Sequence, residues 1–169
     1  MYTYFAKAYS QEKLIPTLAR HYLRGKGDVL KPQDKQKFAQ LIHRHYQQVK
    51  QLGIVEQRIT GQPYKTAAEL FTDLKKNRTI KISVDHHNPG VCDKETNLQY
   101  RFLHEYHHAL LGADFGWQGE LKACDYWSTL TDNQILIRIF RSEIIYQAAA
   151  YFYLGDFPEI QKIVLSQPF

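Results

Sequence analysis

The sequence predicts a mainly α-helical protein with a small β-sheet, an α+β fold, and two observations carry this prediction. Apolar residues recur every three or four positions over several long segments, which is the spacing of one face of an α-helix. Apolar and polar residues alternate clearly over one short segment, 79–84, as is typical of a strand. The chain has 169 residues, 44% of them hydrophobic, so we expect a single folded domain over 1–169.

Three helices are predicted in the first half of the chain. They cover residues 11–24, 32–52 and 66–77. Gly25 and Gly53 follow directly after the first two segments, and glycine is common where a helix ends. The third segment opens with Thr66-Ala67-Ala68-Glu69, a capping box in which the threonine and glutamate satisfy free backbone N–H groups.

Strands are predicted only around the middle of the chain. Residues 79–84 read Thr-Ile-Lys-Ile-Ser-Val, a β-branched alternating run, and form the clearest strand. Residues 58–60, just before Gly61, are a weaker strand candidate. Residues 85–95 contain Asn-Pro-Gly and several charges, which indicates a loop.

The second half of the chain predicts four more helices. They cover 96–111, 120–128 and 131–154, and a last one begins at Asp156. Three glycines between 112 and 119 indicate a turn that separates the first two. Thr131-Asp132-Asn133-Gln134 is predicted to cap the long apolar helix that follows.

Charge is distributed unevenly along the chain. Residues 1–81 have a formal charge of +10 and residues 82–169 have −5, which together give the net charge of +5. The basic helical part, 1–78, could attract nucleic acid or an acidic protein, although such residues more often form a solvated helix face. No segment is apolar for long enough to cross a membrane, and two isolated cysteines do not indicate disulfides. We expect a cytoplasmic protein without a membrane partner.

The most informative motif is His104-Glu105-Tyr106-His107-His108, which fits the pattern H-E-x-x-H. On a helix, His104 and His108 lie one turn apart on the same face, so their imidazoles can bind one zinc ion together. Glu105 would stay off the metal and act as the general base that takes a proton from water. The simplest alternative is an amphipathic helix whose histidines face solvent.

A third metal ligand is needed, and three carboxylates are candidates. Glu120 stands twelve residues after His108, beyond the glycine-rich turn, where a returning helix could direct it at the metal. Asp114 stands at the position that a longer zinc motif gives to its last ligand, but the glycine of that motif is shifted to 112. Glu120 is preferred over Asp114, and Asp125 ranks third.

With these residues the chain resembles the zincin metallopeptidases, and among them the ImmA/IrrE family. The matching segments are Arg101 to His108 and Glu120-Leu121-Lys122-Ala123, within residues 79–128. The resemblance implies a minimal zincin-like catalytic core with H-E-x-x-H on a central helix, in a metal-binding catalytic part over 79–169. It also implies that His104, His108 and Glu120 bind zinc and that Glu105 is catalytic.

The sequence therefore predicts a zinc-dependent hydrolase, and a peptidase in particular. A peptide or protein substrate could pair with the backbone of 79–84 if this strand forms a sheet edge. The alternative from another class is a protein that binds nucleic acid or a protein partner without catalysis and carries a degenerate or accidental metal motif. Asp85-His86-His87 also suggests a manganese phosphoesterase, but that class needs more strands than this sequence offers.

Overall fold

The computed structural model describes residues 9, 11–87 and 90–168, which divide into two compact units. Lys31–Phe115 form one unit, which we call the strand unit. Met1–Leu30 and Gly116–Phe169 form the other, which we call the helical unit. The described residues are mainly helical with one small sheet, so the predicted α+β class is confirmed at this level.

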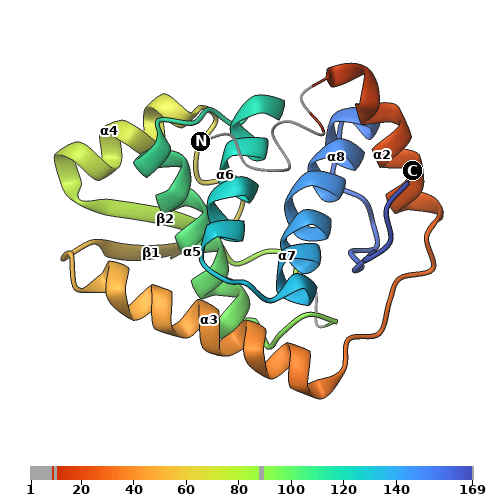
Figure 1. Ribbon diagram of the computed structural model, residues 1–169. Coiled ribbons are helices and arrows are strands. Elements are labelled where there is room, and N and C mark those ends of the chain that lie inside the picture. Colours follow the sequence, from red (N-terminus) through yellow and green to blue (C-terminus); the bar gives the residue numbers. More distant parts are fainter. Residues whose placement is uncertain (1–8, 10, 88–89, 169) are drawn as a thin grey trace. The chain divides into compact units, whose positions relative to one another are not determined.

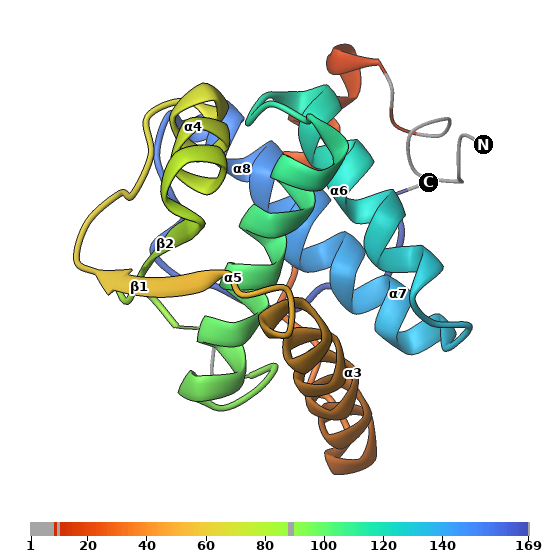
Figure 2. The ribbon, with the colours of Figure 1, turned by 90° about the vertical axis from the view of Figure 1, so that its left-hand side faces the viewer.

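A two-stranded parallel sheet organises the strand unit. The elements of this unit are α3 (Pro32–Lys50), β1 (Val55–Ile59), α4 (Ala67–Asn77), β2 (Thr79–Ser83) and α5 (Lys94–Leu111). The strands are parallel because α4 carries the chain back to the starting edge between them. Figure 1 shows α4 on one side of the strands and α3 on the other. β2 packs against α5, which carries the H-E-x-x-H motif (Figure 2).

The two strands agree with the sequence to different degrees. β2 confirms the predicted alternating strand, because Ile80 and Ile82 are buried while their neighbours along the strand are partly exposed. The prediction for β1 was wrong in its bounds, since the strand runs from Val55 to Ile59 rather than over 58–60. Val55 pairs with Thr79 of β2. This pairing makes β1 begin at Val55, earlier in the chain than its local sequence indicates.

Local signals define the ends of α3 and α4. Pro32 opens α3, and Gly53 has a φ of 76° just beyond its last turn. The helix ends at Lys50, slightly before the predicted end at residue 52. The threonine half of the predicted capping box is confirmed, since the N–H of Glu69 donates to Thr66 Oγ1 at 3.4 Å. The carboxylate of Glu69 reaches one residue further back than the motif requires and accepts the N–H of Lys65 at 2.7 Å.

In the helical unit, all secondary structure of the described residues is helical. They are η1 (Glu12–Leu14), α2 (Ile15–Arg24), α6 (Trp117–Thr129), α7 (Gln134–Phe140), the π-helical η2 (Arg141–Tyr146) and α8 (Gln147–Leu154). α2 packs against α8, and the rings of Trp127 and Phe140 stack with centroids 4.7 Å apart. None of the described helices combines the length and the apolar character that crossing a bilayer requires.

The predicted helix over 131–154 begins later and is not uniform. Asn133, not Thr131, is its N-cap, since Asn133 Oδ1 accepts the N–H of Ile135 at 3.0 Å. Thr131 Oγ1 instead accepts the N–H of Asn133 at 3.1 Å. The segment Arg141–Tyr146 adopts π-helical hydrogen bonding between α7 and α8.

The helix predicted from Asp156 onward is wrong, because residues 155–168 contain no helix. The backbone of this segment is bonded to side chains of the helical unit instead. The N–H of Val164 donates to Ser142 Oγ at 2.9 Å, and the N–H of Lys162 donates to Tyr22 Oη at 3.1 Å. Ile163 and Val164 are buried, so tertiary contacts outweigh the local helix signal.

Candidate metal centre

The H-E-x-x-H motif lies within a regular helix, as the sequence predicts. Asp93 caps the N-terminus of α5 by accepting the N–H of Thr96 at 2.9 Å, and Gly112 follows its last turn with a φ of 56°. Residues 104–108 therefore lie in the last two turns of an intact α-helix. In that conformation His104 and His108 project from the same side.

The imidazoles of His104 and His108 converge through their Nε2 atoms. These atoms lie 3.2 Å apart, and the two ring planes are nearly perpendicular at 88°. Two zinc–nitrogen bonds of about 2.0–2.1 Å that open at a tetrahedral angle put their nitrogens about 3.3 Å apart. The separation in the protein therefore fits two ligands that share one metal ion.

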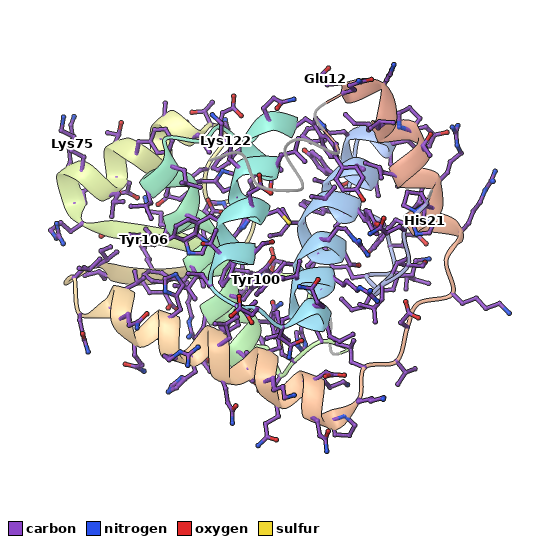
Figure 3. All side chains as sticks on the ribbon, viewed as in Figure 1. Glu12, His21, Lys75, Tyr100, Tyr106 and Lys122 are labelled. Atoms are coloured by element: carbon purple, nitrogen blue, oxygen red, sulfur yellow. The ribbon has the colours of Figure 1, made fainter. Side chains whose placement is uncertain are left out.

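Neighbouring groups orient both rings. His108 Nδ1 lies 3.3 Å from the carbonyl oxygen of Ala113, and a proton on Nδ1 leaves Nε2 available as a ligand. Phe115 meets the His108 ring edge-on, with centroids 5.2 Å apart. Tyr100, labelled on α5 in Figure 3, stacks on His104 with centroids 6.1 Å apart and planes at 25°. Both rings are thus positioned by contacts with their neighbours.

Glu105 is half-buried and lies close to a tyrosine that the sequence does not point to. Burial is the largest cause of the raised pKa of Tyr64, and the negative charges of Asp73 and Glu105 raise it further. The Tyr64 hydroxyl donates to Asp73 Oδ2 at 3.0 Å and accepts the N–H of Lys81 at 2.9 Å. Tyr64 also lines a cavity of about 520 Å³ beside α4. No spacing in the sequence connects Tyr64 with Glu105.

A second histidine pair lies on another side of α5, and sequence reasoning missed it. His107 is fully buried, and its Nε2 lies 2.8 Å from Nε2 of His45 on α3. Burial holds the pKa of His107 well below its usual value, and positive charge on His45, His104 or His108 would lower it further. Burial also lowers the pKa of His45. One neutral ring therefore donates to the other, and this bond joins α3 to α5.

The three carboxylate candidates for a third ligand differ in their local setting. Glu120 is in the first turn of α6, where a carboxylate is favoured by the helix dipole even without a metal. Asp125 is buried further along α6, whereas Asp114 is exposed in the connection before it. Glu120 and Asp125 belong to the helical unit, and the histidines belong to the strand unit. The choice of Glu120 stays a prediction.

The Asp85-His86-His87 segment has a structural role in the loop after β2. Arg101 on α5 donates to the carbonyl oxygen of Ser83 at 3.0 Å and also to those of Asp85 and His86. Asp85 Oδ2 accepts the N–H of Gly61 at 2.6 Å, and His87 Nε2 lies 2.9 Å from the carbonyl oxygen of Cys92. The bonds from Arg101 fix the loop against α5, and none of these contacts gives support to a phosphoesterase.

Comparisons with known proteins add no relative to these observations. No protein-family model matches the chain, and neither curated proteins nor solved structures give a match. The functional argument therefore depends on the residues and the geometry described above.

Proposed function

We propose that this protein is a zinc-dependent hydrolase, and more specifically a peptidase, with a zincin-like core built on α5. The observation that carries the proposal is the His104–His108 pair, whose Nε2 atoms converge to 3.2 Å within an H-E-x-x-H helix. Two imidazoles at this separation suit zinc, which takes nitrogen ligands in tetrahedral geometry. The sequence resemblance to the ImmA/IrrE family supports the same activity.

Glu120 is proposed as the third ligand. With His104 and His108, Glu120 would complete the set of three protein ligands that a catalytic zinc ion takes. Only residues 112–116 connect α5 to α6, and Glu120 is in the first turn of α6, so the chain path favours it. Two histidines and one carboxylate leave a fourth tetrahedral position open, which is the ligand pattern of catalytic zinc sites.

Glu105 is proposed as the general base. A zinc ion at this site would lower the pKa of a water molecule toward about 7 and polarise a substrate carbonyl. Glu105 follows the first ligand directly in the helix, so its carboxylate can take a proton from that water and later donate it to the leaving amine. The nearby phenol of Tyr64 is already bonded to Asp73 and Lys81, and it is assigned no step in the reaction.

Substrate pairing at the outer edge of β2 is not part of this proposal. In the parallel ladder, residues 80 and 82 of β2 bond to β1, so residues 79, 81 and 83 direct their backbone groups outward. The N–H of Lys81 already donates to Tyr64, and the carbonyl oxygen of Ser83 already accepts from Arg101. A peptide would have to displace both contacts to add a strand here.

The decisive experiment measures zinc content and peptide cleavage for the wild type and for Glu105→Gln. We expect about one zinc per chain in both proteins, and a loss of turnover of at least about 100-fold in the variant, since it removes only the base. Glu159→Gln, at an exposed glutamate, is the matched control and should cleave like the wild type. Equal cleavage by wild type and Glu105→Gln would reject the catalytic role. No zinc after reconstitution would favour the non-catalytic alternative.

A further inference from the structure

A basic cavity in the helical unit has no part in the proposed metal site. It measures about 450 Å³ and lies between α2 and the C-terminal segment. Its lining includes four residues from one face of α2 and two from the C-terminal segment: Thr17, Arg20, His21, Arg24, Ser166 and Pro168. Figure 3 shows His21 on the side of α2 that faces this segment.

The charge of the cavity is uncompensated within the described residues. Arg20 and Arg24 are both exposed, and neither side chain has a hydrogen bond or an ion pair with another described residue. None of the described lining residues carries a carboxylate. Because the two arginines are four positions apart on one helix, their like charges repel each other. An anion bound between them would remove this repulsion.

The wall opposite α2 is fixed by hydrogen bonds, so the cavity does not need a ligand to form. The carbonyl oxygen of Ser166 accepts from His21 Nε2 at 3.0 Å and from the Tyr146 hydroxyl at 3.1 Å. One residue earlier, the carbonyl oxygen of Leu165 accepts from Arg141 at 2.5 Å. The Ser166 hydroxyl lies 3.3 Å from His21 Nε2, at the cavity.

We propose that this cavity binds a terminal phosphate group, a phosphomonoester, through Arg20 and Arg24. The planar guanidinium group of arginine matches two phosphate oxygens at once, and a dianion balances two arginines. The hydroxyls of Thr17 and Ser166 can donate to the remaining oxygens. The wall formed by the C-terminal segment favours a phosphate that enters end-on over a phosphodiester backbone that runs across an open surface.

The test uses a short fluorescent oligonucleotide with either a 5′-phosphate or a 5′-hydroxyl, and measures binding to the full chain by anisotropy. The 5′-phosphate form should bind at least about tenfold more tightly, because charge-assisted bonds to a phosphate are strong. Inorganic phosphate should compete with it. Arg24→Gln and Arg20→Gln should each remove the difference between the two oligonucleotides, with unchanged circular dichroism spectra.

Arg138→Gln is the matched control, because Arg138 is an exposed arginine on α7 that does not line the cavity. It should bind both oligonucleotides like the wild type. Equal binding of the two oligonucleotides by the wild type would overturn the proposal and indicate backbone contacts instead. The proposal is also overturned if inorganic phosphate fails to compete, or if Arg138→Gln has the same effect as Arg24→Gln.

Discussion

Helix α5 contributes to two pairs of histidines that differ in geometry. His104 and His108 converge with their Nε2 atoms 3.2 Å apart, a separation suited to a shared metal ion. His107 and His45 approach to 2.8 Å, which is a direct hydrogen bond between α5 and α3. The first pair is within one helix, and the second joins two helices.

The difference follows from helix geometry and burial. Successive helix residues point about 100° apart, so His107 and His108 face different surroundings although they are adjacent. His107 is fully buried and its pKa is held well below its usual value by burial, so a neutral ring that donates or accepts is favoured there. A histidine-rich motif therefore does not define a metal site by composition. The proposed metal site depends on the convergence of the Nε2 atoms of His104 and His108.

The largest effect is expected for His108→Ala. This change removes one of the two converging nitrogens, and stoichiometric zinc binding should be lost, as measured by metal analysis after zinc loading and dialysis. Gln47→Ala is the control, since Gln47 is exposed on α3 and the change should leave zinc binding unchanged. Unchanged zinc content in His108→Ala would mean that the metal binds elsewhere.

A weaker but still large effect is expected for Glu120→Gln. A neutral amide is a poor substitute for a carboxylate ligand, so zinc affinity should fall by about 10- to 100-fold in a competition with a chromogenic chelator. Asp114→Asn should bind zinc like the wild type. The reverse result, with weak binding only in Asp114→Asn, would move the third ligand to Asp114.

We expect a substitution in the second histidine pair to change stability and to leave metal binding unchanged. His45→Ala removes the partner of a fully buried ring, which should lower the free energy of unfolding by about 1–3 kcal/mol in urea denaturation. Zinc content should not change. Gln47→Ala, at an exposed residue of α3, should shift stability by less than about 0.5 kcal/mol, as is usual for an exposed site. Loss of zinc in a folded His45→Ala variant would contradict the separation of the two pairs.

The local parts of the fold could be predicted from the sequence, because they depend on neighbouring residues. The helix around His104, the N-cap at Thr66 and the alternating strand β2 each have their own signal, and each is present. The convergence of His104 and His108 follows from the helix alone. These features needed no information about tertiary contacts.

The remaining features depend on contacts between distant residues. His45 and His107 are 62 positions apart, and Tyr64 comes near Glu105 only in the folded strand unit. The predicted helix after Asp156 fails because Ser142 and Tyr22 bond to the backbone of the C-terminal segment. Periodicity and capping motifs carry no signal for such contacts. The third ligand belongs to the same class, which is why Glu120 stays a proposal.

The smallest expected effect concerns Asp73, a buried carboxylate of the strand unit. Neighbouring side chains account for its burial without a metal ion. Asn77 Nδ2 donates to it at 2.7 Å, and Lys81 and Tyr64 also contact it. The Asn77 bond is the largest cause of its lowered pKa, and Lys81 and Tyr64 lower it further. The charged form is therefore favoured in the folded protein.

Asp73→Asn should consequently lower the free energy of unfolding by about 1 kcal/mol at pH 7, where the charged carboxylate contributes fully. An unfolded aspartate has a pKa of about 3.9, so as the pH falls below this value the unfolded wild type binds the proton first. The stability difference between wild type and variant should shrink until the pH passes the lower pKa of the folded state. Urea denaturation at pH 7 and near pH 3 measures this change, with Asp132→Asn at an exposed aspartate as the control. A difference that is the same at both pH values would mean that hydrogen-bond geometry, and not charge, stabilises Asp73. In that case Asn77, Lys81 and Tyr64 would hold Asp73 in place without its charge adding to the stability of the fold.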